Sequence, residues 1–180
     1  MVRRQRRGVA RAADRGLHEP HSHQSRQRRR FQQPRQRLRH KRDYDHAIAD
    51  YGAAIALNPH YAEAFYNRAL AYRRKGAIDR AIADYDRTIS LDAGNAAAFN
   101  NRGDALMQLG RYERAIEDFD QAIRLNGDYA IAYANRGLAY RNKGDPGRAM
   151  ADFRTALALK PDAGTRAYLE TALKELGAKP

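Results

Sequence analysis

The chain has 180 residues, and its formal net charge of +13 comes entirely from residues 1–42, which hold 15 basic and 2 acidic residues. Residues 43–180 hold 19 of each sign, so this larger part has no net basic field of the kind that predicts nucleic-acid binding. The sequence contains no cysteine, which excludes disulfides and thiolate chemistry.

Residues 1–42 are rich in Arg, Gln and His and show no apolar periodicity. This composition predicts a disordered basic arm. If the arm is authentic, it could bind nucleic acid or another acidic surface by neutralising phosphates, which is the alternative function we consider. Residues 18–23 read H-E-P-H-S-H, but three histidines in an unfolded arm do not make a metal site. We therefore predict no metal and no cofactor.

A second interpretation of the same segment is a translation in the wrong reading frame. Codons for residues 23–38 can be chosen so that reading one base later gives I-N-P-D-N-A-D-A-F-N-N-R-G-N-A-Y. That string is similar to L-N-P-H-Y-A-E-A-F-Y-N-R-A-L-A-Y at residues 57–72, which lies 34 residues further along. We hypothesise that residues 1–42 contain a mis-framed repeat, in which case a signal peptide could also have been lost.

From Asp43 onward a helical pattern begins. Tyr44–Leu57 carries small and aromatic residues at helical spacing, as expected of the second helix of a pair. Three blocks of 34 residues follow, at 62–95, 96–129 and 130–163. They share an aromatic at place four, Asn-Arg at six and seven, a small residue at eight, Ala at twenty and an aromatic at twenty-four: Phe65, Phe99 and Tyr133; Asn67-Arg68, Asn101-Arg102 and Asn135-Arg136; Ala69, Gly103 and Gly137; Ala81, Ala115 and Ala149; Tyr85, Phe119 and Phe153. A fixed period of this length predicts stacked helical units.

Each block divides into two helices. In the second block we expect one buried stripe before Gly110, a residue suited to ending a helix, and a second helix over Tyr112–Leu125. That stripe would comprise Phe99, Gly103, Leu106 and Leu109. Asp145-Pro146 predicts a helix start in the third block. Residues 164–180 are expected to form a C-terminal capping helix, whose apolar face would comprise Tyr168, Leu169, Ala172, Leu173 and Leu176.

The blocks resemble the tetratricopeptide repeat family, through runs such as A-A-A-F-N-N-R-G-D-A-L at residues 96–106 and R-Y-E-R-A-I-E-D-F-D-Q-A-I at residues 111–123. The resemblance implies an all-α fold, a right-handed superhelix of antiparallel helical hairpins (an α-solenoid). It covers one half repeat and three full repeats over residues 43–163. It also implies a non-catalytic scaffold or adaptor that binds a peptide segment or a helix of another protein in a concave groove.

In this family the groove is lined by the first helix of each repeat. The matching places here suggest a set of peptide-binding residues: Asn67, Asn101, Asn135, Tyr66, Asn100, Asp104, Arg73 and Arg141. Asparagine donates and accepts hydrogen bonds at once, so a ladder of asparagines suits the backbone of an extended peptide. An equally open alternative is that these asparagines only support helix packing.

Two further patterns limit the functional reading. Family members that bind chaperone tails carry Lys at the fifth place and Asn at the ninth, which this chain lacks, so we do not expect that activity. Its residues there are Tyr66, Asn100 and Ala134, then Leu70, Asp104 and Leu138. Arginines at place seven recur with Asp50, Asp84, Asp118 and Asp152, which favours structural ion pairs over an acidic ligand.

Signals for other classes of protein are absent from the sequence. No nucleophile–base pair and no Gly-rich phosphate loop appear, so we do not expect an enzyme. No apolar run reaches membrane-spanning length, and the first residues lack the apolar core of a signal peptide. We therefore expect a cytoplasmic protein with a protein or peptide partner and no membrane partner. Nucleic acid would be a partner only through an authentic basic arm.

Overall fold

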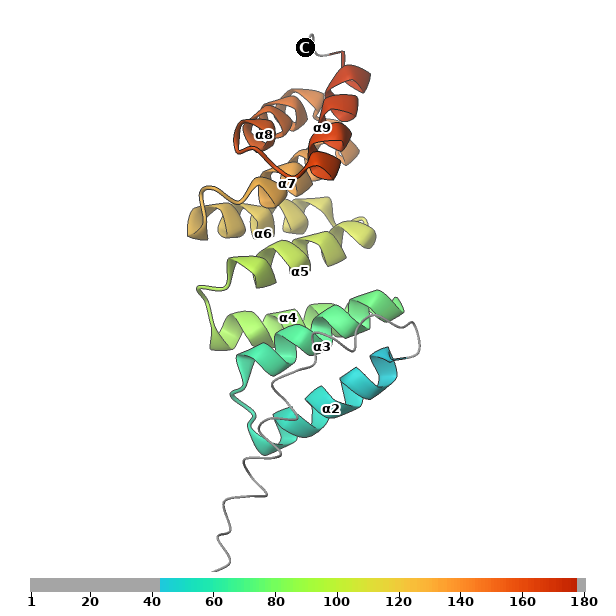
Figure 1. Cartoon of the computed structure of the whole chain (residues 1–180), viewed down its shortest axis with the longest axis vertical. Helices are drawn as coiled ribbons and strands as arrows, with labels where there is room; N and C mark the ends of the chain where they lie inside the picture. The colour runs from blue at the N-terminus through green and yellow to red at the C-terminus, as the bar shows by residue number, and fades with distance from the viewer. Residues whose placement is uncertain (1–42, 178–180) are drawn as a thin grey trace, which may run out of the picture. The chain divides into compact units, whose positions relative to one another are not determined.

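The computed structural model describes residues 43–177, and all its regular structure in that range is α-helical. The eight helices follow one another in chain order (Figure 1). They are α2 (Tyr44–Leu57), α3 (Ala62–Lys75), α4 (Ile78–Leu91), α5 (Ala96–Gln108), α6 (Tyr112–Leu125), α7 (Ala130–Asn142), α8 (Pro146–Ala158) and α9 (Ala163–Glu175). The predictions made for residues 1–42, namely the basic arm, the histidine tract and the mis-framed repeat, lie outside the described residues.

Helices that are adjacent in sequence pack against each other, most extensively as the pairs α3–α4, α5–α6 and α7–α8. A glycine in the left-handed conformation follows the first helix of each pair, with φ of 84° at Gly76, 70° at Gly110 and 85° at Gly144. A residue with a Cβ would be strained there, which explains why glycine recurs at these stops. The predicted all-α solenoid of helical hairpins is confirmed.

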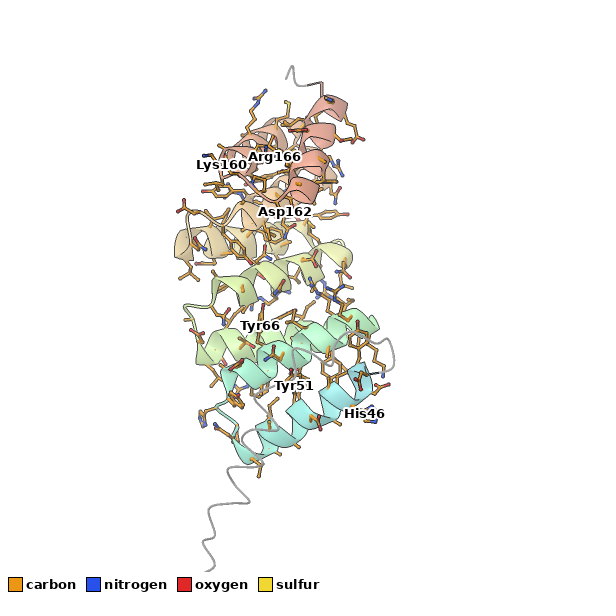
Figure 2. The ribbon with its side chains drawn as sticks, in the orientation of Figure 1. His46, Tyr51, Tyr66, Lys160, Asp162 and Arg166 are labelled. Atoms are coloured by element: carbon orange, nitrogen blue, oxygen red, sulfur yellow. The ribbon has the colours of Figure 1, made fainter. Side chains whose placement is uncertain are left out.

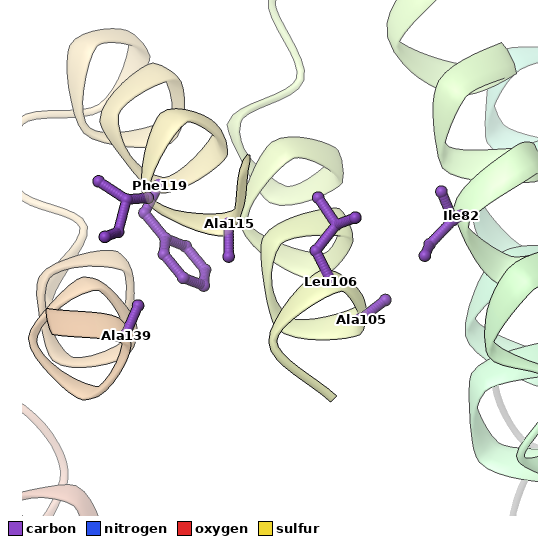
Figure 3. Close-up of a cluster of buried hydrophobic side chains, with 7 residues drawn as sticks. Ile82, Ala105, Leu106, Ala115, Phe119 and Ala139 are labelled. Atoms are coloured by element: carbon purple, nitrogen blue, oxygen red, sulfur yellow. The ribbon is translucent and has the colours of Figure 1, made fainter. Parts of the chain in front are cut away.

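Small residues at the eighth place allow the two helices of a hairpin to approach closely. A Cβ added to Gly103 would come within 2.7 Å of Cε1 of Phe119, a side chain that is fully buried. Figure 3 shows Phe119 on α6 in the cluster that also holds Leu106 of α5 and Ala139 of α7. The small residue at this place therefore serves helix packing.

The prediction of a buried stripe in the second block is wrong at Leu109. Its side chain is 37% exposed, because α5 ends at Gln108 and Leu109 is the residue that caps it. Once the chain leaves the helix, helical spacing no longer places a side chain on the buried face. The predicted apolar face of α9 is wrong at Tyr168, which lies within that helix but is 42% exposed, although its neighbour Leu169 is fully buried.

Two helix starts are fixed by aspartate side chains. Oδ1 of Asp145 accepts a hydrogen bond from the backbone N–H of Arg148 (3.0 Å), and Pro146 is the first residue of α8, as the sequence predicts. Oδ1 of Asp162 accepts from the backbone N–H groups of Gly164 (2.9 Å) and Thr165 (3.0 Å) at the start of α9. These bonds satisfy amides that have no partner within the helix itself.

Candidate peptide-binding face

The arginine at the seventh place of each block binds an aspartate in the second helix of the same block. Each guanidinium donates two hydrogen bonds of 2.6–2.8 Å to the two oxygens of one carboxylate. The carboxylates are only 4–6% exposed. The pairs are Arg68–Asp84, Arg102–Asp118 and Arg136–Asp152. The predicted ladder of structural ion pairs is confirmed for these three blocks.

Two of these arginines also reach back to the preceding block. Nη1 of Arg102 donates to Asp86 of α4 at 2.7 Å, and Nη1 of Arg136 donates to Asp120 of α6 at 2.6 Å. Each arginine thus bridges two consecutive second helices. Our sequence analysis missed this link, although Asp86 and Asp120 are separated by one period of 34 residues. The corresponding place for Arg68 is Gly52, which has no side chain to accept the third bond.

The bridges are strongly electrostatic. Burial raises the pKa of the Asp118 carboxyl, and the hydrogen bonds from Arg102 oppose that rise. The same hydrogen bonds raise the pKa of Arg102 above its ordinary value. Cζ of Arg102 also lies 5.6 Å from the ring centroid of Phe99, the fourth-place aromatic of its block. These arginines are therefore occupied within the fold.

The asparagines of the sixth place connect neighbouring first helices. Nδ2 of Asn101 on α5 donates to the hydroxyl of Tyr66 on α3 at 2.8 Å, and Figure 2 labels Tyr66 on that helix. Nδ2 of Asn135 on α7 donates to Oδ1 of Asn100 on α5 at 3.0 Å. Asn67 and Asn100 are 8% and 4% exposed. Both bonds use Nδ2 as the donor. Oδ1 of Asn101 and Oδ1 of Asn135 accept no hydrogen bond from another described residue.

Charged contacts extend the same layer of first helices toward their C-terminal ends. Arg73 of α3 forms an ion pair with Asp104 of α5. Arg141 of α7 lies 3.5 Å from a carboxylate oxygen of Glu175 and 3.4 Å from the hydroxyl of Tyr168, both on α9. The side chains of Arg73, Asp104 and Arg141 keep 21%, 29% and 32% of their surface exposed. The structure thus brings the predicted residues together along α3, α5 and α7.

A buried tyrosine lies beneath this layer. Tyr85 of α4 is fully buried, and its hydroxyl has no hydrogen-bond partner among the described residues. Its ring centroid is 6.0 Å from that of Tyr66. Burial raises the pKa of the Tyr85 hydroxyl, and the positive charge of Arg73 opposes the rise. The sequence shows Tyr85 only as the recurring aromatic at place twenty-four, and nothing in that pattern indicates an unsatisfied hydroxyl.

Residues 43–177 show neither a metal-binding cluster nor a membrane-spanning helix. No group of three or more His, Asp or Glu side chains among these residues could hold a metal ion. None of α2–α9 combines the length and apolar character that crossing a bilayer requires.

Comparison with known proteins identifies one repeat family along the chain. Models described as "TPR repeat" match residues 36–76, 69–110 and 103–144, and a model described as "Tetratricopeptide repeat" matches residues 130–163. A search of curated proteins found no match.

Several solved structures have a similar fold. A crystal structure of MamA is 26% identical, covers 75% of this chain and 80% of its own, and has a TM-score of 0.68. The second TPR domain of human RPAP3, in complex with the HSP70 peptide SGPTIEEVD, is 35% identical, with 64% and 93% coverage and a TM-score of 0.58. The first TPR of Spaghetti (RPAP3), bound to the HSP90 peptide SRMEEVD, is 26% identical, with 65% and 94% coverage and a TM-score of 0.59.

Proposed function

Because the chain belongs to the tetratricopeptide repeat family, we propose that it is a protein-interaction scaffold that acts by binding rather than by catalysis. The bound element is an extended segment of another protein, held on the face formed by α3, α5 and α7. The observation that carries this proposal is the row of amide oxygens on Asn101 and Asn135, whose Nδ2 atoms are already used between helices. Peptide-bound relatives with the same fold support it.

The proposed ligand differs from the chaperone tails that those relatives bind. Their peptides end in EEVD, whereas the fifth place of this chain carries Tyr66, Asn100 and Ala134 instead of lysine. A neutral residue cannot balance the charge of a terminal carboxylate. The charge available on this face is that of Arg73 and Arg141, which supports an acidic side chain within the ligand as the favoured partner.

An acidic ligand would compete with partners already present. Arg73 pairs with Asp104, and Arg141 contacts Glu175 on α9. The carboxylate of Glu175 is 64% exposed, so it can turn into solvent at little cost. We therefore assign the stronger ligand contact to Arg141, and we assign Tyr66 as an apolar anchor. Asn67 and Asn100, which are almost buried, would support the side chains of Asn101 and Asn135.

The test begins with selection of a peptide-display library on the full chain. Affinities of a selected peptide are then measured by fluorescence anisotropy for the wild type and for Asn101→Asp. A carboxylate at this place can accept a hydrogen bond from the Tyr66 hydroxyl, so the link between α5 and α3 survives. The carboxylate can still accept from the peptide backbone, but its negative charge repels the acidic side chain of the ligand, so we expect binding to weaken by about 1–3 kcal/mol.

A matched control separates the face from the charge. Gln121→Glu adds the same charge on α6, in the layer of second helices, and should leave the affinity unchanged. The melting temperature of Asn101→Asp should stay close to that of the wild type. The proposal fails if both variants weaken binding equally. It also fails if no selected peptide binds to α3, α5 and α7. A selected peptide with a terminal EEVD would contradict the assigned ligand class alone.

A further inference from the structure

The hydroxyl of Tyr85 is a buried polar group that the proposed function leaves unused. The residue is fully buried in α4, and its hydroxyl has no hydrogen-bond partner among the described residues. Such a group costs stability, because it loses its bonds to water and gains none in return. The next two blocks avoid this cost, because Phe119 and Phe153 occupy the same place of the repeat and are also fully buried. Packing at this place therefore does not require a hydroxyl.

The phenol of Tyr85 lies beneath the face formed by α3 and α5. Its ring centroid is 6.0 Å from that of Tyr66, which Figure 2 labels on α3. Burial is the main cause of the raised pKa of its hydroxyl, and the charges of Arg73 on α3 and Asp104 on α5 also act on that pKa. These two side chains pair with each other and keep 21% and 29% of their surface exposed. Because the phenol is fully buried, this ion pair lies on its solvent side.

The ion pair between Arg73 and Asp104 can exchange one carboxylate for another. Both side chains reach solvent, whereas the carboxylate of the Arg102–Asp118 pair is only 4% exposed. Asp104 also accepts a hydrogen bond of 3.3 Å from Nε2 of Gln108, one turn further along α5, and would keep this donor after losing Arg73. A neutral carbonyl would not displace Asp104, since only an anion restores the charge balance of the guanidinium. An incoming carboxylate would also find the unused donor beneath the pair.

We propose that Arg73 and Tyr85 form a carboxylate subsite between α3 and α5, which binds a glutamate side chain of the bound segment. This subsite deepens the proposed function and rests on it. The guanidinium of Arg73 turns from Asp104 to one oxygen of the incoming carboxylate, and the hydroxyl of Tyr85 donates a hydrogen bond to the other. Glutamate suits the subsite better than aspartate, because its longer side chain reaches a phenol that is fully buried. This glutamate is additional to the acidic side chain assigned to Arg141.

The sequence restricts the subsite to one junction among the three full blocks. Met107 takes the place of Arg73 in the second block, and neither Phe119 nor Phe153 carries a hydroxyl. A guanidinium and a tyrosyl hydroxyl therefore occur together in the first full block alone. A ligand glutamate bound there would fix the register of the segment along α3, α5 and α7.

The test is a double-mutant cycle between the phenol and the ligand glutamate. Peptides are selected on the full chain from a display library with one fixed glutamate, and a selected peptide is also made with leucine in its place. By fluorescence anisotropy, Tyr85→Phe should weaken binding of the glutamate peptide about tenfold and leave binding of the leucine peptide unchanged, because only the carboxylate accepts a bond from the phenol. The melting temperature of Tyr85→Phe should equal or exceed that of the wild type, because an unsatisfied hydroxyl is removed.

Asp104→Asn gives an independent test, because the exchange predicts an effect of opposite sign. Removing the competing carboxylate frees Arg73 and should strengthen binding of the glutamate peptide about two- to fivefold. This gain should disappear when Arg73→Gln is added, because the freed cation is then missing. Tyr112→Phe, which removes a partly exposed hydroxyl from α6, is the control and should change neither the affinity nor the melting temperature.

Equal effects of Tyr85→Phe on the two peptides would overturn the subsite, as would no effect on either peptide. Weaker binding of the glutamate peptide by Asp104→Asn would also overturn it, and so would a melting temperature of Tyr85→Phe well below that of the wild type. In each case the proposed function stands if Asn101→Asp still weakens binding of the selected peptide. If Asn101→Asp has no effect, the proposed function itself fails.

Discussion

Gly52 marks the one arginine bridge of the three that lacks its second carboxylate, and Gly52→Asp should supply it. Nη1 of Arg68 lies 3.7 Å from the place where a Cβ at residue 52 would stand. The equivalent aspartates in the next two blocks bind their arginines at 2.7 and 2.6 Å. The substitution therefore introduces a side chain into space that is free of clashes and next to a cation.

The expected gain has two parts. Replacing glycine inside α2 by aspartate improves helix propensity by roughly 0.3 kcal/mol. The new ion pair would be partly exposed and should add about 0.3–1 kcal/mol. The sum of about 0.6–1.3 kcal/mol corresponds to a rise in melting temperature of roughly 1–5 °C for a chain of this size.

Gly52→Asn isolates the electrostatic part, because asparagine has a similar shape and helix propensity but no charge. Thermal unfolding followed by circular dichroism at low salt should rank Asp above Asn, and Asn above the wild type. In 1 M NaCl the difference between Asp and Asn should shrink, because the Debye length falls to about 3 Å. An aspartate variant no more stable than the asparagine variant at low salt would refute the reasoning.

Arg102→Ala leaves the buried carboxylate of Asp118 unpaired and should destabilise the chain by about 3–5 kcal/mol in urea unfolding, and adding Asp118→Asn should recover part of this loss. A double variant no more stable than Arg102→Ala would contradict that account. Gly137→Ala puts a Cβ 2.6 Å from Cε1 of Phe153. The overpacking should cost about 1–3 kcal/mol and outweigh the gain in helix propensity of about 1 kcal/mol, so the melting temperature should fall. A higher melting temperature would show that Phe153 moves aside freely. Hydrogen bonds from the Thr165 side chain and backbone lower the pKa of the Asp162 carboxyl, so its stabilisation is complete above the unfolded pKa of about 4 and is lost as the pH falls through the lower folded value. Melting temperatures of the wild type and Asp162→Asn between pH 2 and 6 should therefore converge at the acid end, and parallel curves would argue against this role.

Much of this fold follows from the sequence because each hairpin is a local structure. The period places the helices, and pairs such as Arg102–Asp118 lie within one block, so the pattern of that block already contains both partners. Helix starts such as Asp145 depend on a few adjacent residues. These features were predictable without knowing how one block sits on the next.

Contacts between blocks were harder to predict, because they depend on the angle between neighbouring hairpins. The sequence places Asn135 and Asn100 at different places of the repeat, and nothing in the period says that one donates to the other. The same holds for the pairing of Arg73 with Asp104. The candidate face was therefore recognised as a set of residues but not as a network, and its ligand stays a proposal.

The arginine bridges also set the order in which the array should come apart. Arg102 joins α4 to α6 and Arg136 joins α6 to α8, so ion pairs link the central helices at two successive junctions between hairpins. Arg68 has no carboxylate of α2 to hold, and α9 carries Glu170 where the next arginine would stand. Cooperativity should be greatest in the middle and weakest toward α2 and α9. Amide hydrogen exchange should accordingly proceed inward from the two terminal helices, with α6 as the last segment to open.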